Sequence, residues 1–309
     1  MFDNALIEQR QTVAPIEWYR EPHGWAERNA LYVSATEAMF VDAATKAIAD
    51  AGLRPDQIDG IVFVSTTGIS TPSIDARVAP RLGLRPDVRR VPMFGLGCAG
   101  GVTGLATTAR LASAEPGSHW LFVCVETCSI SIQLDSDDPA AIVATALFGD
   151  GAAAAIVSTR KVSNSSDGLA TILGAGEKLW PDTLGIMGWR VEDPGLAVIF
   201  DRAIPPFVTG ELAAAIDGIL GQLDLAQSDV DRFCCHPGGT KVVDAIEQAL
   251  AFGDGTLDLE RQTLREHGNM SAPTVMFVLK ALIERGLPQR VMMTAFGPGF
   301  TCAGLVLEK

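Results

Sequence analysis

The sequence is short of positive charge and of long apolar runs. Its 24 lysines and arginines stand against 37 aspartates and glutamates, which gives 309 residues a formal net charge of −13. This balance argues against a general nucleic-acid or anionic-membrane binder. The longest apolar stretches, such as residues 152–157, fall far below the ~20 residues that span a bilayer. The N-terminal sequence MFDNALIEQRQ has no apolar signal region, so we expect a cytoplasmic protein.

Cysteine is also sparse, with six residues and no CxxC pair. Reduced thiols are therefore expected rather than a disulfide framework. A zinc site built from Cys234, Cys235 and His236 is excluded because adjacent residues of a strand point to opposite faces. Apolar residues, by contrast, make up 48% of the chain, with 31 glycines and 17 prolines. That composition excludes disorder and predicts a globular protein with about two domains' worth of core.

Strand and helix patterns alternate along the chain. Continuous apolar runs at 59–66, 120–125 and 152–157 predict strands buried on both faces. Ser34, with Glu37 three residues later, resembles a capping box and predicts a helix over 34–52. The expected fold class is therefore α/β, with helices covering a buried sheet.

Two Gly-rich signals occur in the same order in both halves of the chain. Residues 94–101 (FGLGCAGG) and 233–239 (FCCHPGG) each lead from a predicted strand toward a helix. Residues 148–151 (FGDG) and 296–299 (FGPG) each precede an apolar strand. The pattern predicts two homologous halves joined at the polar stretch 161–168, with chance similarity of Gly-rich turns as the alternative. It also predicts that Cys98 and His236 occupy equivalent positions.

Three polar residues are candidates for a shared site between these halves. Cys98 lies at a strand-to-helix turn, where the positive end of the helix would lower the thiol pKa and favour the nucleophilic thiolate. His236 would project from a strand end, and Asn269 lies in a short polar turn before a predicted helix. His and Asn side chains can together donate hydrogen bonds to a developing oxyanion. Taken singly, each residue could instead be an ordinary core or turn residue.

Five blocks then give a specific resemblance that covers essentially the whole chain. They are GLGCAGGVTGLA, ALFGDGAAAAIV, CCHPGGTKVVDAIE, REHGNMSAPTVMFVL and AFGPGFTCAGLVL. In this order they resemble the type III polyketide synthases, the chalcone-synthase-like branch of the thiolase superfamily. The chain is most similar to bacterial members that make alkylpyrones or alkylresorcinols. Ketoacyl synthase III-like condensing enzymes are a remote alternative, because they differ at the His and Asn blocks.

The resemblance implies a duplicated thiolase fold of five αβαβα layers, in a homodimer. The halves would be residues 1–165, with the nucleophilic Cys, and 166–309, with the His and Asn. The implied acyltransferase uses acyl-CoA and malonyl-CoA with no metal or redox cofactor. Cys98 would accept the acyl group, His236 would stabilise its thiolate, and His236 and Asn269 would hold the malonyl thioester during decarboxylation.

Further site residues follow from the same motif matching. Phe148 is implied as a gatekeeper between the CoA tunnel and the elongation cavity, and Val198 falls where the family has a second gatekeeper Phe. Medium or long aliphatic starters are therefore expected rather than aromatic ones. The remaining implied substrate-binding positions are Thr71, Cys128, Ser131, Ser271, Gly297 and Pro298, and the implied CoA-binding positions are Gly238, Gly239 and Lys241. Thr71 is also where the family reaches across the dimer interface.

The chain departs from the family pattern at its start, because Met1 falls where the family already has an opening strand and a basic helix. We therefore expect the 309-residue chain to be marginally stable or weak in CoA affinity, unless the natural reading frame begins earlier. An inactive synthase-like protein or a partner subunit is a second alternative. A papain-like Cys–His–Asn hydrolase is a third, although the context of Cys98 is not that of such enzymes.

Overall fold

Two mixed sheets separated by a pair of helices form the centre of the molecule. The computed structural model describes residues 5–134, 136–160, 168–253 and 255–309. The first sheet contains β1 (Gly60–Val64), β2 (Arg89–Met93), β3 (His119–Thr127) and β4 (Asp150–Ser158). The second contains β5 (Thr171–Leu179), β8 (Arg232–Cys235), β9 (Arg290–Gly297) and β10 (Thr301–Glu308). A separate hairpin is formed by β6 (Met187–Glu192) and β7 (Gly195–Phe200).

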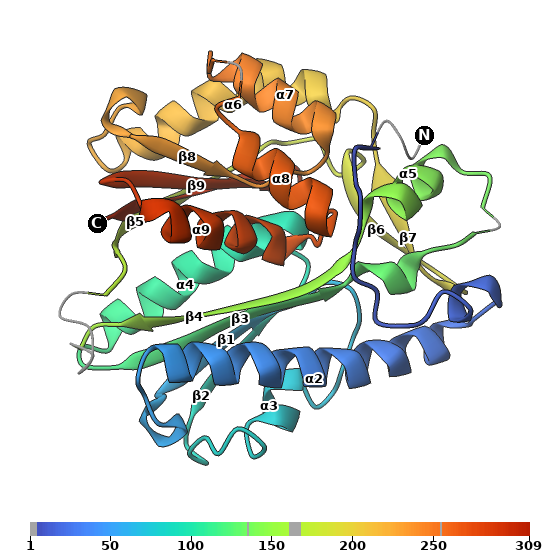
Figure 1. The fold of residues 1–309 in the computed structure, drawn as a ribbon, viewed down its shortest axis with the longest axis horizontal. Helices are drawn as coiled ribbons and strands as arrows, with labels where there is room; N and C mark the ends of the chain where they lie inside the picture. The colour runs from blue at the N-terminus through green and yellow to red at the C-terminus, as the bar shows by residue number, and fades with distance from the viewer. Residues whose placement is uncertain (1–4, 135, 161–167, 254) are drawn as a thin grey trace.

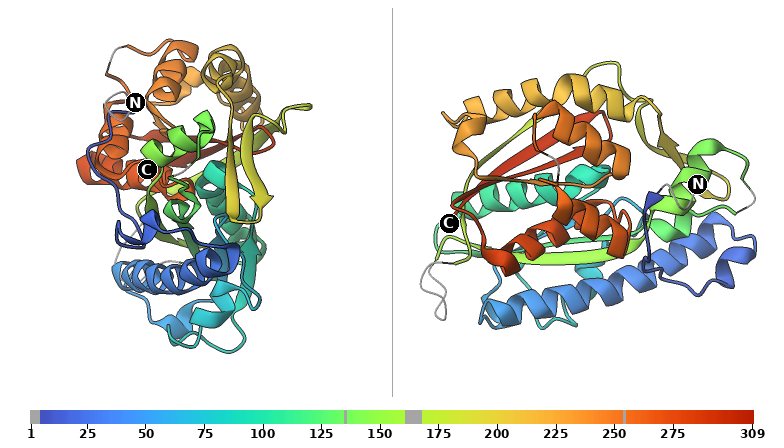
Figure 2. Two further views of the ribbon diagram at one scale, coloured as in Figure 1. Left: turned by 90° about the vertical axis from the view of Figure 1, so that its right-hand side faces the viewer. Right: turned by 45° about the horizontal axis from the view of Figure 1, so that its top comes forward.

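Helices occupy three layers around these sheets. The outer layers hold α2 (Trp25–Asp50) and α3 (Ile74–Val78) on one side and α6 (Ile204–Gly221) and α7 (Thr240–Ala249) on the other. The central layer is formed by α4 (Gly100–Ala114) and α9 (Ala272–Gly286), while α5 (Pro139–Leu147) lies near the β6–β7 hairpin and α8 (Asp258–His267) precedes α9. Figures 1 and 2 show these helices and sheets stacked in five layers. The α/β class and the αβαβα architecture implied by the resemblance are therefore confirmed.

The two sheets share one pattern of connections. Their strand orders are β2-β1-β3-β4 and β5-β10-β9-β8. Each contains two adjacent parallel strands, β1 with β3 and β8 with β9, followed by an antiparallel neighbour, β4 or β10. Thus β1 corresponds to β8, β3 to β9 and β4 to β10. The predicted linker, apart from Gly168, lies outside the described residues.

This correspondence corrects the predicted equivalence of Cys98 and His236. The Phe148 and Phe296 runs do precede corresponding strands, β4 and β10. Cys98, however, follows β2, whereas His236 follows β8, the counterpart of β1. The counterpart of the Cys98 turn is the Asn269 turn, because these two turns lead into the paired central helices. Gly-rich turns occur at several strand–helix junctions, so the sequence pattern alone could not distinguish them.

The predicted start of the first long helix is also wrong. The helix α2 begins nine residues before Ser34, at Trp25. The Ser34 hydroxyl donates to the carbonyl of Leu31, as it does inside a helix, and Glu37 pairs with two arginines beyond the helix. Other boundaries lie close to their predictions: β1 falls within the range 59–66, and β3 and β4 include the ranges 120–125 and 152–157.

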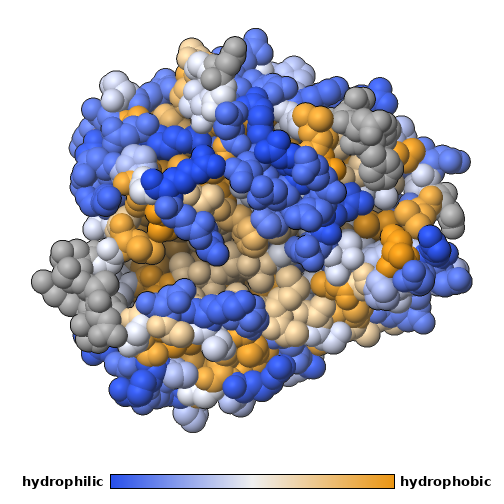
Figure 3. Space-filling view, in the orientation of Figure 1, coloured by the Kyte–Doolittle hydropathy of each residue, from blue (hydrophilic) through white to orange (hydrophobic). Residues whose placement is uncertain are grey.

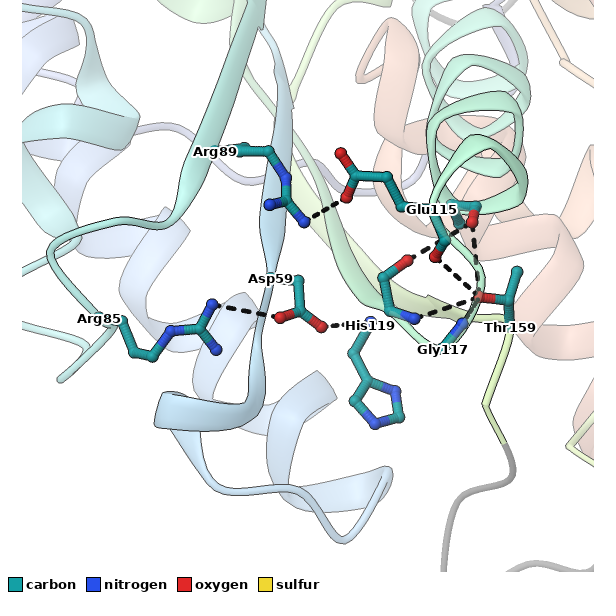
Figure 4. Close-up of polar contacts among 9 residues, drawn as sticks. Asp59, Arg85, Arg89, Glu115, Gly117, His119 and Thr159 are labelled. Atoms are coloured by element: carbon teal, nitrogen blue, oxygen red, sulfur yellow. Dashed lines mark hydrogen bonds and ion pairs between the residues drawn. The ribbon is translucent and has the colours of Figure 1, made fainter.

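The starts of β1 and β3 are held together by polar contacts (Figure 4). Asp59, immediately before β1, accepts hydrogen bonds from the backbone N–H of His119 at 2.9 Å and from Arg85 at 3.2 Å. The hydroxyl oxygen of Thr159 accepts from the backbone N–H of Gly117 at 2.9 Å. The Asp59 contacts fix the register of the parallel strands β1 and β3, and the Thr159 contact joins the end of the antiparallel strand β4 to the start of β3.

The first sheet ends at β4 within the described residues. This strand pairs with β3, and its run GAAAAIV packs between the core on the α4–α9 side and the core on the α2 side while staying partly exposed. Figure 3 shows this part of the face as a weakly hydrophobic hollow between more hydrophilic rims. No helix among the described residues combines the length and apolar character needed to cross a bilayer.

The central helices approach each other closely at their N-terminal ends. A Cβ atom on Gly101 of α4 would lie 2.4 Å from the carbonyl oxygen of Ala272 in α9, and one on Gly100 would lie 2.6 Å from Val64. Such distances are far below van der Waals contact, so only glycine fits there. The close approach brings the turn before α4 beside the turn before α9.

Candidate active site

Cys98 and Asn269 meet where α4 and α9 converge, and Asn269 bonds the backbone beside His236. Cys98 lies in a short 3-10 turn, Gly97–Ala99, and its Sγ is 4.0 Å from Oδ1 of Asn269. The Asn269 amide nitrogen donates to the carbonyl of Gly238 at 3.1 Å, two residues after His236. All three side chains are buried. These contacts join the Cys98 turn to the Asn269 turn and to the backbone after β8.

The amide of Asn269 is held in one orientation. Its Oδ1 accepts from the backbone N–H of Ser271 at 2.8 Å, while its Nδ2 donates to Gly238. One Nδ2 hydrogen remains for a ligand, because an amide nitrogen carries two. Asn269 is thus prepared to donate one further hydrogen bond.

His236 is fixed through its backbone rather than its ring. Its N–H donates to the carbonyl of Thr294 in β9 at 2.8 Å, and its carbonyl accepts from Gly238 at 3.0 Å. Both ring nitrogens are buried and have no hydrogen-bond partner among the described residues. An imidazole with both nitrogens free can accept a proton at one and contact a ligand at the other.

Burial favours the neutral forms of both reactive groups. Burial raises the pKa of Cys98 to about 11, although hydrogen bonds from Ser271 and Asn269 oppose it. Burial also lowers the pKa of His236 to about 3. The expectation that the helix end lowers the Cys98 pKa is thus corrected, because desolvation outweighs it. A thiolate would form here by transfer of the thiol proton to His236.

A buried carboxyl group that the sequence analysis missed supports the Cys98 turn. Glu126 in β3 accepts hydrogen bonds from the Thr66 N–H at 3.0 and 3.1 Å and from the Thr67 hydroxyl at 2.9 Å. Thr66 in turn accepts from the N–H of Gly97 at 3.1 Å. Burial raises the pKa of Glu126 to about 8. An acidic residue inside the apolar run VCVETC was the available signal.

Several predicted substrate-binding residues form one apolar cluster beside Asn269. Its members are Cys128, Ala144, Phe148, Trp189 and Val198. The cluster adjoins Asn269, because the carbonyl of Asn269 accepts a hydrogen bond at 3.0 Å from the backbone N–H of Gly149, the residue after Phe148. Phe148, Cys128 and Val198 thus come together from separate parts of the chain.

Trp189 is the member of this cluster that the sequence analysis did not identify. Its ring centroid is 6.0 Å from that of Phe148, and it lies directly opposite Val198 across the β6–β7 hairpin. A large aromatic ring therefore occupies space beside the position where Val198 was expected to leave room.

Three other predicted positions pack against the Cys98 turn. A Cβ on Gly297 would lie 2.6 Å from both the Cβ of Ala99 and the carbonyl oxygen of Leu96. A Cβ on Gly97 would lie 2.6 Å from Cδ of Pro298. Ser271, the residue before α9, contacts Asn269 through its N–H. These residues form the wall on the β9 and α9 sides of Cys98.

Two predicted pocket positions are placed differently. Ser131 turns its hydroxyl back onto the carbonyl of Cys128 at 2.7 Å. Thr71 is exposed in the loop between β1 and α3, away from the buried residues. Within one copy of the chain, Thr71 therefore lines the protein surface.

The predicted CoA-binding residues run from the site to the surface. The carbonyl of Gly238 accepts a hydrogen bond from the Asn269 amide. Gly239 directly precedes α7, and its carbonyl accepts a hydrogen bond from the N–H of Val242 at 3.0 Å. Lys241 is exposed at the start of α7 and lines a shallow surface groove between α6 and α7. This order places the backbone of Gly238 and Gly239 inside and the positive charge of Lys241 outside.

Comparisons with known proteins cover nearly the full length. The family model "Chalcone and stilbene synthases, N-terminal domain" matches residues 16–161, and the C-terminal domain model of the same family matches residues 171–309. A "putative chalcone synthase" of Bacillus subtilis (strain 168) is 35% identical over 311 residues, covering 97% of this chain and 85% of that protein. The 1,3,6,8-tetrahydroxynaphthalene synthase of Streptomyces peucetius subsp. caesius is 36% identical over 307 residues, covering 98% and 81%.

Solved structures give the same result. The 1,3,6,8-tetrahydroxynaphthalene synthase of Streptomyces coelicolor A3(2), a bacterial type III polyketide synthase, matches with a TM-score of 0.93 at 28% identity, over 99% of this chain and 87% of that one. The C-terminal type III polyketide synthase domain of Steely1 from Dictyostelium matches with a TM-score of 0.93 at 27% identity, over 100% and 88%.

Proposed function

The chain belongs to the chalcone and stilbene synthase family and is a type III polyketide synthase with a thiolase fold, and from this premise we propose how it works. It condenses malonyl-CoA iteratively onto an acyl-CoA starter through an acyl-Cys98 intermediate. The observation that supports this assignment is the contact of Cys98 with Asn269, whose amide bonds the backbone beside His236. Membership of this family excludes the alternative of a papain-like Cys–His–Asn hydrolase.

Loading of the starter begins with the Cys98 thiol and the His236 imidazole both uncharged. Because burial raises the pKa of Cys98 and lowers that of His236, the thiol proton moves to the imidazole only as the thiolate attacks the starter carbonyl. The tetrahedral intermediate collapses to acyl-Cys98. CoA leaves as a thiolate and takes the proton back from His236. Both side chains end neutral, as burial favours.

Extension uses the same two donors on a different substrate. The remaining Nδ2 hydrogen of Asn269 and a protonated ring nitrogen of His236 hold the thioester oxygen of malonyl-CoA. When the carboxylate leaves as CO2, its bonding electrons pass to the enolate, whose charge rests on that oxygen. The enolate carbon attacks acyl-Cys98, the Cys98 thiolate leaves, and the lengthened chain reloads.

The substrate class is a CoA thioester with an aliphatic tail, and the products are of the pyrone or resorcinol type. Gly238, Gly239 and Lys241 contact the CoA moiety, while Phe148, Cys128 and Val198 contact the growing chain. Trp189 limits the width of that passage opposite Val198, so the tail is threaded as a slender alkyl chain rather than as a bulky ring. No metal or redox cofactor takes part in these steps.

A homodimer through the β2 edge is part of the proposal. The strand β2 lies at the edge of the first sheet. Phe94, directly after β2, is 59% exposed, and Ile69, in the loop after the neighbouring β1, is 53% exposed. Exposed large apolar side chains beside an open edge suit a second copy of the chain. Thr71, in the same loop as Ile69, would then reach the partner.

Turnover of radiolabelled malonyl-CoA with a panel of acyl-CoA starters tests the proposal directly. We expect labelled polyketide with aliphatic starters of medium or long chain, and none from Cys98→Ala. A folded protein that none of the starters acylates at Cys98, and that releases no CO2, would instead support the alternative of an inactive protein or a partner subunit. A clear preference in kcat/KM for coumaroyl-CoA would contradict the aliphatic assignment.

A further inference from the structure

The backbone that carries His236 is supported on both edges of its strand. On the inner edge, β8 pairs with β9, and His236 itself donates to the carbonyl of Thr294. The outer edge of β8 is the end of the second sheet within the described residues. Neither ring nitrogen of His236 has a hydrogen-bond partner among the described residues, so the orientation of the imidazole depends on how firmly this backbone is held.

Glu260 of α8 holds that outer edge. Its side chain is fully buried, and Oε1 accepts from the backbone N–H of Cys235, the residue before His236, at 3.0 Å. Its Oε2 accepts from Arg232, at the start of β8, at 2.6 Å. The carboxylate therefore spans both ends of the short strand. A charge is costly to bury, so this pairing with Arg232 is what makes the arrangement tolerable.

The first half contains a related but not equivalent contact. There β1 corresponds to β8, and the buried Glu126 of β3 accepts from the backbone N–H of Thr66, just after β1, from the inner edge of the strand. Glu260 acts instead on the outer edge of β8 and spans its two ends. The full burial of its carboxylate separates this contact from the surface ion pairs of the chain.

We propose that Glu260 is a positioning residue for His236. Its carboxylate fixes the end of β8 through the Cys235 N–H and thereby directs the imidazole toward Cys98. The inference rests on the proposed role of His236 in accepting the thiol proton.

Two substitutions at position 260 separate positioning from stability. Glu260→Ala and Glu260→Gln both remove the charge that faces Arg232, but glutamine keeps a carbonyl that can accept from Cys235. We expect Glu260→Ala to lower kcat by roughly 10²-fold, as a displaced catalytic group does, with little change in KM for malonyl-CoA. Alkylation of Cys98 by iodoacetamide should slow in parallel. Glu260→Gln should retain most of both rates although it melts as early as the alanine variant.

Glu247 of α7 provides a matched control. Its carboxylate accepts from the backbone N–H of Leu257 at 3.0 Å and from Arg261 at 2.8 Å, the same kinds of contact away from His236. Glu247→Ala should lower the melting temperature. Its kcat, normalised to the molecules whose Cys98 reacts with iodoacetamide, should not change.

Equal kcat and equal alkylation rates in the alanine and glutamine variants would overturn the proposal. If Glu260→Ala fails to fold, Glu260→Asp replaces it, because the shorter side chain keeps a charge near Arg232 but withdraws the acceptor from Cys235. Slow Cys98 alkylation in that variant supports positioning, and a wild-type rate overturns it. Should the wild-type protein fail to condense malonyl-CoA, the proposed function fails, whereas the alkylation rates still decide the role of Glu260.

Discussion

Among single residues, Asn269 is proposed to act in the decarboxylation of malonyl-CoA but not in the acylation of Cys98. In the proposed mechanism its amide supplies one donor to the malonyl thioester, whereas loading of Cys98 depends on proton transfer to His236. Asn269→Ala should therefore reduce malonyl-CoA decarboxylation by ~10²–10³-fold, the usual loss for one oxyanion donor, while still allowing acylation of Cys98. Labelled CO2 release and the intact mass of the enzyme after exposure to starter-CoA alone measure the two steps separately.

Cys98→Ala is the control for this experiment, since it should lose acylation while staying folded. An Asn269→Ala protein that keeps its melting temperature but cannot be acylated would show that Asn269 acts in loading. Cys124 and Cys302, which lie within strands and are buried, should affect stability rather than acylation when changed to Ser.

Glu126 gives a second prediction at the residue scale, on the pH dependence of stability. Its pKa is about 8 in the folded protein, raised by burial above the ordinary 4.5. Between these pH values the folded state holds a proton that the unfolded state has released. Its contribution to stability is therefore full below pH 4.5 and is lost as pH rises through 8.

Glu126→Gln should remove this dependence. The free energy of unfolding of the glutamine variant, relative to the wild type, should increase by on the order of a few kcal/mol from pH 5 to pH 8. Urea denaturation at several pH values measures the difference. Glu177→Gln, at an exposed position of β5, is the control and should show a constant difference. A constant difference for Glu126→Gln as well would contradict the raised pKa.

At the scale of elements, the contact between α4 and α9 is what assembles the site. A methyl group on Gly101 would meet the Ala272 carbonyl at 2.4 Å, so the two helices would have to separate. Gly101→Ala should cost about 1–3 kcal/mol of stability, as overpacking does. It should also slow acylation of Cys98, because the turns before the two helices move apart.

Gly210 in α6 is the matched control, since a Cβ there would meet nothing within 4 Å. Gly210→Ala should raise stability by about 0.5–1 kcal/mol, the helix preference of alanine over glycine, and leave acylation unchanged. Thermal melts and acylation rates of both variants provide the comparison. If Gly101→Ala matched Gly210→Ala in both measurements, the close helix approach would not be required.

For the whole molecule, the proposed homodimer forms through the open edge of the first sheet at β2. Phe94 follows this strand and is 59% exposed, so in the proposed dimer it is buried against the second copy. Phe94→Asp should shift the protein toward a monomer of 32.6 kDa, since a charge at the interface core is costly to desolvate. Sedimentation velocity measures the change.

Leu184→Asp provides the control for that shift. Leu184 is 79% exposed but lies before the β6–β7 hairpin, far along the chain from the β2 edge. It should leave the sedimentation coefficient unchanged. A wild-type protein that sediments as a monomer at micromolar concentration would contradict the dimer itself.

The fold class and the family followed from the sequence alone, which also singled out Cys98, His236 and Asn269 as candidate reactive residues. Strands buried on both faces, such as β1, appear as continuous apolar runs, and the blocks around Cys98, His236 and Asn269 carry chemistry in residue types that local patterns reveal. Local signals of this kind depend on neighbours along the chain. The resemblance to the family, rather than a local pattern, marked Phe148 and Val198, which the structure places in one apolar cluster.

Only the tertiary structure decided which positions correspond and which groups support the site. Gly-rich turns look alike in sequence, so the pairing of the Cys98 turn with the Asn269 turn required the order of strands in the two sheets. Trp189 and Glu260 contact the site from elements far away in the chain. Desolvation, which raises the pKa of Cys98 against the effect of its helix, is a property of the packed interior, and no local sequence pattern measures it.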